Sequence, residues 1–187
     1  GWLGLTIPEE YGGSAAGAVE LCLLLEHSLK GLAPIGGIGP TLITAAAYER
    51  FGNEEQRTRA LELTVGGGTL SISMSEPGAG SDVAALRCKA ERDGDEWVIN
   101  GQKTWCSNAH FADRILLVAR TDSSGAKHEG ITMFDVPADI PGLQITGIDT
   151  MGGKEVNDLY FTDVRLPAGS VVGEVGGGWQ QLMTGLN

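Results

Sequence analysis

The sequence predicts an α+β fold, in which an N-terminal helical segment is followed by an antiparallel β-barrel or β-sandwich. Residues 1 to about 70 carry helical patterning with helix-ending glycines, and after Gly66-Gly67-Gly68 the apolar period changes to that of strands. Eight strand candidates then follow within roughly 95 residues, which indicates a closed or sandwiched antiparallel sheet. Glycine makes up 29 of the 187 residues and fits a sheet with many turns.

Three helices are expected in the first part of the chain. The first covers residues 17–29, ends near Gly31 and is apolar on nearly all sides, so we expect it to be buried. The second begins at Pro40 and ends at Gly52. The third begins at residues 53–56, where an Asn cap, two Glu residues and a Gln supply a reciprocal cap and an acidic first turn.

The strand candidates are separated by turn signals. They lie at residues 71–75, 86–91, 96–99, 103–107, 114–120, 130–136, 143–148 and 158–164. Asp93-Gly94 and Asn100-Gly101 are hairpin signals, so we expect a turn at each and a three-stranded meander. The strand that follows Asn100-Gly101 then carries Trp105 and Ser107 on one face of the sheet.

Composition excludes several classes of function. The chain has 13 basic and 24 acidic residues, a net charge of −11, and no basic cluster, which disfavours nucleic-acid binding. The three cysteines and three histidines are scattered without ligand spacing, so no metal site is predicted and the cysteines suit a reducing compartment. The apolar stretch at residues 19–25 is too short to span a membrane.

Two runs carry the chemistry. Residues 72–82, ISMSEPGAGSD, lead from an apolar strand into a tight turn whose N–H groups, with the Ser81 hydroxyl, can face an anion such as a pyrophosphate. A plain strand-to-strand turn is the alternative. In residues 100–108, NGQKTWCSN, the Trp105 indole and the Ser107 hydroxyl suit a flat, hydrogen-bonding heterocycle, and a Trp packed in the core is the alternative.

These runs belong to a wider pattern, and with it the chain resembles the acyl-CoA dehydrogenase family of flavoproteins. The pattern includes GWLGLTIPEEYGG (1–13), LLLEHSL, FGNEEQ (51–56), the two runs above, MGGKEVNDLYFTDVRLP (151–167) and VVGEVGGGW (171–179). Their order and spacing agree with the family over almost the whole chain.

The resemblance implies three parts. They are an incomplete N-terminal helical domain at residues 1–70, a middle β-barrel domain that binds flavin at 71–178, and the truncated start of a C-terminal helical domain at 179–187. A helical apolar pattern begins there at Trp179, Leu182, Met183 and Leu186. Because the chain starts with Gly and family members are considerably longer, we expect an internal fragment.

The resemblance also implies FAD as the cofactor, with the flavin ring against residues 72–75 and 105–107 and the pyrophosphate near Gly80 and Ser81. Ser81 is expected to contact the substrate as well. The implied cofactor-binding residues are Ile72, Met74, Ser75, Gly80, Ser81, Trp105, Cys106 and Ser107.

Some of these positions depart from the family pattern. Ser75 and Ser107 stand where relatives usually carry Thr, which keeps the hydroxyl. Cys106 stands where an aliphatic residue is usual and is expected to be an inert apolar filler if it is buried. Residues 151–158 also depart from the family pattern. They form a loop that lies near a subunit contact or near the far end of the cofactor, and a solvent-exposed turn is the alternative.

The implied reaction is α,β-dehydrogenation of an acyl-CoA thioester, with hydride transfer to FAD N5 and electrons passed to an electron-transfer flavoprotein. The resemblance places the Glu base in the C-terminal helical domain, so no catalytic residue is assigned. A flavin oxidase or monooxygenase on the same scaffold is one alternative, and a non-catalytic FAD- or acyl-CoA-binding subunit of a hetero-oligomer is another. We further expect a homo-oligomer, dimer or tetramer, in the cytoplasm, a bacterial cytosol rather than a mitochondrial matrix.

Overall fold

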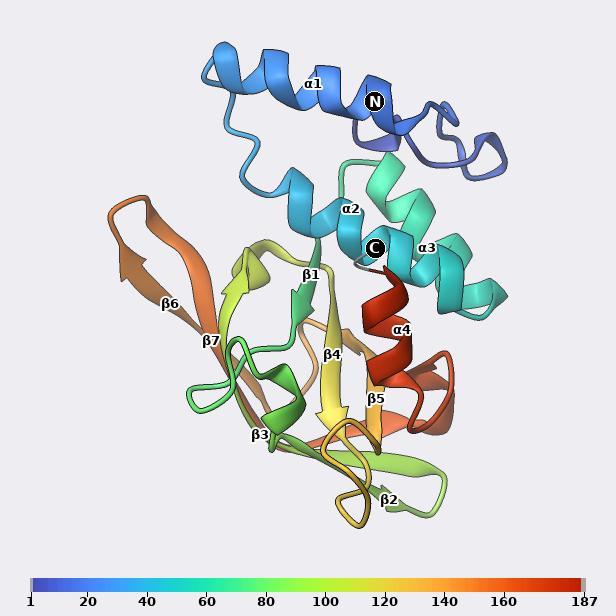
Figure 1. The fold of residues 1–187 in the computed structure, drawn as a ribbon, viewed down its shortest axis with the longest axis vertical. Helices are drawn as coiled ribbons and strands as arrows, with labels where there is room; N and C mark the ends of the chain where they lie inside the picture. The colour runs from blue at the N-terminus through green and yellow to red at the C-terminus, as the bar shows by residue number, and fades with distance from the viewer. Residues whose placement is uncertain (1, 186–187) are drawn as a thin grey trace.

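The computed structural model describes residues 2–185 and has a helical layer lying over one side of a twisted sheet (Figure 1). The helices are α1 (Ala18–Lys30), α2 (Ile38–Phe51), α3 (Glu54–Val65) and α4 (Gly178–Gly185). The strands are β1 (Leu70–Ser73), β2 (Lys89–Asp93), β3 (Glu96–Ser107), β4 (Arg114–Arg120), β5 (Ile131–Pro137), β6 (Leu143–Thr150), β7 (Gly153–Pro167) and β8 (Val171–Val172). The predicted α+β fold, helices first and sheet second, is confirmed.

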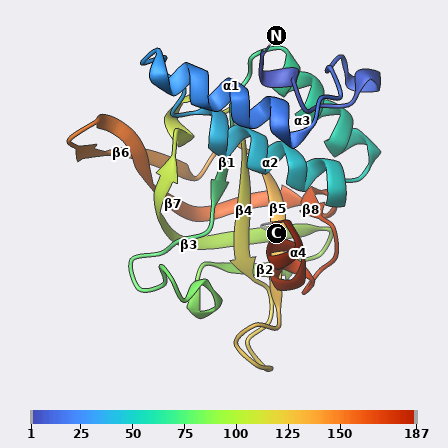
Figure 2. The same cartoon turned by 45° about the horizontal axis from the view of Figure 1, so that its top comes forward.

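The sheet is mostly antiparallel, as predicted. Its strands follow the order β6-β7-β3-β2-β4-β5-β8, and β1 pairs with β4 in parallel. A single parallel pair, Lys89 with Arg120, joins β2 to β4. The long β6–β7 hairpin projects sideways beyond the rest of the sheet (Figures 1 and 2), and its turn carries the fully exposed Met151.

Both faces of the central strands are buried. Along β4, Ile115 and Leu117 pack into a core between the layers of the folded sheet, whereas Leu116 and Val118 pack into a second core under α2 and α3. Successive side chains of a strand point to opposite faces, so a strand covered on both sides is apolar throughout. The uninterrupted run ILLVA therefore marks the centre of the molecule.

A buried carboxylate joins the helical layer to the sheet. Asp135 of β5 is 2% exposed and accepts hydrogen bonds from the Tyr48 hydroxyl of α2 (2.6 Å) and from Arg114 Nε of β4 (2.8 Å). Arg59 of α3 also forms an ion pair with it. Charged hydrogen bonds of this kind are stronger than neutral ones, so the cluster fixes α2 and α3 on β4 and β5.

The predicted burial of the first helix is wrong. Helix α1 has no buried residue within the described part of the chain, and Val19 and Leu29 are 69% and 62% exposed. It lies on the outer side of the helical layer (Figure 2), where the described residues cover it on one side at most. The sequence pattern reports how apolar a helix is, but not which part of the molecule covers it.

The predicted turn at Asn100-Gly101 is also wrong, because β3 runs through this position without a break. Thr162 and Asp163 of β7 lie opposite Asn100 alone, which makes a β-bulge. The Asn100 side chain donates to Asp163 Oδ1 and accepts from the Asp163 N–H, both at 2.9 Å. A Cβ on Gly101 would lie 2.7 Å from Cys88 Cα, so the glycine permits close packing of β3 and does not reverse the chain.

Other predicted boundaries differ at strand ends. The strand predicted at 86–91 begins at Lys89, and the one predicted at 158–164 extends over Gly153–Pro167. The turn at Asp93-Gly94 is confirmed, since Asp93 pairs with Glu96. So is the Asn53 cap, which accepts from the Gln56 N–H at 2.9 Å. Of the expected final helical pattern, Leu186 lies outside the described residues. Among the described residues, no helix is long and apolar enough to cross a membrane.

Candidate cofactor-binding site

The end of β3 lies beside β1 and the residues that follow it, which brings the two predicted runs together. The Thr104 N–H donates to the Ser75 carbonyl at 2.9 Å, and the Ser71 hydroxyl donates to the Ser107 carbonyl at 2.6 Å. Cys106 Sγ lies 3.3 Å from the Ile72 carbonyl. Residues 72–75 and 104–107 thus lie side by side, although the two segments are about thirty positions apart in the sequence.

Trp105 is directed outward by a second bulge. Thr104 and Trp105 of β3 together lie opposite Asp158 of β7, because Lys103 pairs with Leu159 and Cys106 with Asn157. Trp105 has a φ of 58°, in the left-handed region that bulky residues rarely adopt. Its side chain is 60% exposed. Bulges and unusual backbone conformations cluster at functional sites, and this one leaves an indole ring uncovered.

Several polar groups of the two runs have no partner in the described structure. Within residues 2–185, the hydroxyls of Ser75, Ser81 and Ser107 and the Trp105 indole N–H make no hydrogen bond to the protein. All four groups belong to residues that the sequence singled out. A ligand with a flat ring and several acceptor and donor atoms fits such a surface, because the ring can stack while the free hydroxyls bind its edge.

Ile72 and Met74 pack against one core of the molecule, whereas Cys106 lies in the other. Ile72 and Met74 are half-buried and pack against the core under the helices. Cys106 is 2% exposed, and burial raises the pKa of its thiol, so the expectation of an apolar filler agrees with its surroundings. Its side chain faces the Ser71 hydroxyl at 3.1 Å, away from the exposed face. Its thiol is therefore not available to a ligand on that face.

Gly80 and Ser81 are exposed beyond a tight turn. The Glu76 N–H donates to the Ala79 carbonyl and the Ala79 N–H donates to the Glu76 carbonyl, both at 3.0 Å, which closes the turn at Pro77 and Gly78. Asp82, next to Ser81, is held by Lys127 at 2.9 Å. The turn therefore delivers Gly80 and Ser81 to the surface, although no contact between described residues joins them to Trp105.

Glu76 and Lys103 were missed by the sequence reasoning. Lys103 is fully buried, and its ammonium group contacts Glu76 Oε1 at 2.8 Å and the Met74 carbonyl at 2.9 Å. Burial lowers the pKa of Lys103, and the neighbouring Glu76 opposes that shift. Lys and Glu are seldom buried unless they are paired. The sequence signal for this pair was therefore the presence of one Glu in the first run and one Lys in the second.

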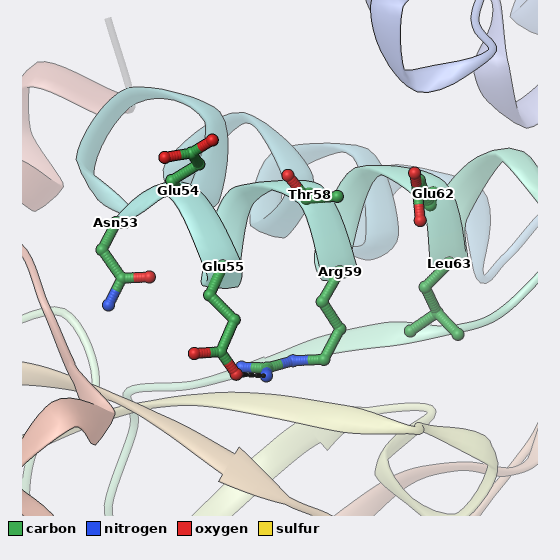
Figure 3. A pocket seen from close by; sticks show the side chains of 7 residues that line it. All are labelled: Asn53, Glu54, Glu55, Thr58, Arg59, Glu62 and Leu63. Atoms are coloured by element: carbon green, nitrogen blue, oxygen red, sulfur yellow. Dashed lines mark hydrogen bonds and ion pairs between the residues drawn. The ribbon is translucent and has the colours of Figure 1, made fainter.

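Two of the hollows in the described structure lie differently with respect to these residues. A cleft of about 560 Å³ begins at Asn108, directly after Ser107, and lies between the α1–α2 connection and β7. Its lining includes Pro34, Gly36, Gly37, Asn108, His110 and Phe111. The second hollow, about 1040 Å³, follows the outer side of α3 (Figure 3), where Glu55 and Arg59 point toward each other. None of the predicted site residues lines it.

Comparison with known proteins agrees with the resemblance. The sequence profile of the acyl-CoA dehydrogenase N-terminal domain matches residues 1–68, and that of the acyl-CoA dehydrogenase middle domain matches residues 71–164. Acyl-CoA dehydrogenase FadE26 of Mycobacterium tuberculosis is 39% identical over 196 residues, which cover 100% of this chain and 48% of that protein.

A mitochondrial protein and a solved structure give similar matches. Isovaleryl-CoA dehydrogenase of Solanum tuberosum is 35% identical, with 99% of this chain and 46% of that protein covered. The crystal structure of the ChsE4-ChsE5 complex from Mycobacterium tuberculosis matches with a TM-score of 0.89 and 37% identity, covering 100% of this chain and 49% of that one. The chain spans about half the length of the curated relatives it matches.

Proposed function

The chain belongs to the acyl-CoA dehydrogenase family, and on that premise we propose that it supplies the flavin-binding part of an enzyme that oxidises the Cα–Cβ bond of an acyl-CoA thioester. One observation carries the proposal. The exposed Trp105 ring and the unpartnered hydroxyls of Ser75 and Ser107 lie on one surface, built from the two runs that resemble the family's flavin-binding motifs.

Each residue has a separate task in this proposal. Trp105 covers one face of the flavin ring and keeps water from it. Ser75 and Ser107 bind the polar edge of the ring, and Gly80 and Ser81 bind the pyrophosphate through main-chain N–H groups and a hydroxyl. Bound FAD supplies the two-electron chemistry by accepting a hydride at N5.

The thioester is proposed to enter beside Ser81, with its acyl group in the cleft that begins at Asn108. The cleft supports this because its wall includes Pro34 and Phe111, which are apolar, and because Asn108 directly follows Ser107 in the chain. Gly36 and Gly37 leave it wide on the side of α2. A wide and largely apolar cleft next to a redox-active ring suits a hydrocarbon substituent.

The remaining expectations follow from the family. We propose that electrons pass to an electron-transfer flavoprotein and that the full-length protein forms a homo-oligomer. We also propose a cytoplasmic location. The three cysteines support it, since Cys22, Cys88 and Cys106 are all free, as suits a reducing compartment.

A second candidate is a subunit of a complex of two different chains, in which this chain binds FAD or acyl-CoA but is not itself the catalyst. The similar ChsE4-ChsE5 structure is by name a complex of two chains, which supports this candidate. A partner chain would then supply what the reaction needs beyond the flavin surface.

An anaerobic reduction experiment tests the proposal. The full-length protein is purified with its flavin, and a panel of acyl-CoA thioesters is added while the visible flavin absorbance is followed. We expect one class of thioester to bleach the band, because substrate oxidation reduces the flavin. Oxidised flavin that persists with every thioester would favour the second candidate, and a full-length protein that binds no flavin would contradict both.

A further inference from the structure

A buried ion pair lies directly beneath the candidate flavin surface. Lys103 is fully buried and Glu76 is 9% exposed, and the Lys103 ammonium contacts Glu76 Oε1 at 2.8 Å. The ammonium also donates to the Met74 carbonyl at 2.9 Å. Neither side chain reaches the exposed face that carries Trp105. The proposed function assigns neither of them a task.

The Lys103 contact fixes the direction of one peptide group. In a trans peptide the C=O and the following N–H point in opposite directions within one plane. Because the Met74 carbonyl points inward at Lys103, the Ser75 N–H must point away from the buried ion pair. Within residues 2–185 this N–H has no acceptor. Lys103 therefore keeps a donor available next to the free Ser75 hydroxyl.

The Glu76 carboxylate fixes a third segment. Its Oε2 accepts from the Arg87 N–H at 2.7 Å and its Oε1 accepts from the Cys88 N–H at 2.8 Å. These bonds replace ladder bonds at the start of β2 and anchor both ends of the loop that presents Gly80 and Ser81. The pair thus links three segments: residues 74–76, the β3 residues before Trp105, and the segment that enters β2.

Stability alone does not account for this arrangement. A buried ion pair often stabilises a fold no better than well-packed apolar residues of the same volume, because both charges lose their hydration. A second reason for charged groups at these positions is their geometry, since an ammonium group and a carboxylate can bind several main-chain groups at once.

We propose that Lys103 and Glu76 are positioning residues for flavin, which hold the Ser75 N–H, the Gly80-Ser81 loop and the Trp105 strand in the arrangement that binds the cofactor. This inference rests on the proposed function. The pair acts through the main chain and does not touch the cofactor. Its removal should therefore change flavin binding more than it changes folding.

The test compares three variants of the full-length protein, each prepared without cofactor and titrated with FAD. Lys103→Met with Glu76→Gln removes both charges and keeps the volumes, so no uncompensated charge is left buried. We expect its FAD dissociation constant to rise by roughly tenfold or more. Bound FAD should also show a shifted visible band, because the ring edge has lost a fixed donor.

Tyr48→Phe is the matched control. It removes one hydrogen bond to the buried carboxylate of Asp135, far from the flavin surface, so it should lower the melting temperature but leave FAD binding unchanged. Glu76→Asp keeps both charges and withdraws the carboxylate by one methylene. It should weaken FAD binding by roughly threefold or more, and it replaces the double variant in the test if that variant does not fold.

The outcomes separate this inference from the proposed function. Suppose that wild-type protein binds FAD and that the folded double variant binds it equally well and with the same spectrum. The positioning role is then wrong and the proposed function stands. The same conclusion follows from Glu76→Asp if the double variant does not fold. A loss of affinity that Tyr48→Phe reproduces also overturns the inference, since it then follows from lowered stability. A wild-type protein that does not bind FAD contradicts the proposed function itself.

Discussion

Replacing Trp105 with alanine should weaken FAD binding without lowering the stability of the cofactor-free protein. An aromatic side chain buries about 150–250 Å² when it is fully covered. The Trp105 side chain is 60% exposed, and a flavin stacked on one ring face would cover about half of that exposed area. At about 25 cal/mol per Å² this burial contributes roughly 1–2 kcal/mol.

Ring stacking adds about 0.5–1.5 kcal/mol to the area term. The total of about 2–3 kcal/mol corresponds to a dissociation constant raised between about 30-fold and 150-fold. The free energy of unfolding without FAD should stay within about 0.5 kcal/mol of wild type, because the ring is exposed and packs little against the protein. Alanine keeps the Cβ atom that is strained at a φ of 58°, so the backbone strain does not differ between the two proteins.

The assay is a fluorescence titration of the full-length, cofactor-free protein with FAD, together with urea unfolding of the same samples. Trp2→Ala is the matched control, since Trp2 is 71% exposed but lies in the N-terminal helical part. It should bind FAD like wild type. Binding of FAD by Trp105→Ala within about twofold of wild type, or an equal loss of binding in Trp2→Ala, would contradict the stacking role of Trp105.

Three further predictions test the surroundings of the site. Gly36→Val has open space around its new Cβ and narrows the cleft, so KM for the preferred acyl-CoA should rise by roughly threefold or more. The control Gly39→Val should leave this KM unchanged. Equal effects of the two substitutions would exclude the cleft as the acyl site. Tyr48→Phe should lower the free energy of unfolding in urea by about 1.5–3 kcal/mol, because it removes a hydrogen bond to the buried Asp135, and a loss below about 0.5 kcal/mol would show that this bond does not hold α2 on the sheet. Burial raises the pKa of Cys88 from 9.0 to about 11, so the unfolded chain ionises first and stability should fall by roughly 2–3 kcal/mol as the pH rises through this range. Cys88→Ala should make that fall shallower, and an unchanged slope would show that the thiol does not contribute.

Elements set by local signals were predicted well. Strand β4, Arg114–Arg120, has the bounds that the sequence indicates, because a continuous apolar run between polar residues needs no distant information. The Asn53 cap depends only on Gln56, three residues later, and both of its hydrogen bonds form.

Elements set by distant partners were not predicted. Asn100-Gly101 has a strong hairpin signal, but the Asn100 side chain bonds to Asp163 of β7 and Gly101 packs on Cys88, so the strand continues. Helix α1 is apolar, yet its exposure depends on what lies beside it. These outcomes follow from tertiary contacts that override local propensity.

The candidate site divides in the same way. Residue types such as the indole of Trp105 and the hydroxyls of Ser75 and Ser107 pointed to a cofactor surface, and the structure brings these residues together. The bulge that turns Trp105 outward depends on pairing with β7, and the Lys103–Glu76 pair depends on β3 passing beside β1. Neither can be read from the spacing of residues along the chain.

A crystal structure of the full-length protein grown with FAD is the most direct test of the flavin-binding surface. The prediction is that the flavin ring lies against Trp105, with its polar edge bonded to Ser75 and Ser107 and the pyrophosphate beside Gly80 and Ser81. Flavin bound at any other surface of residues 2–185, with Trp105 still exposed to solvent, would contradict it.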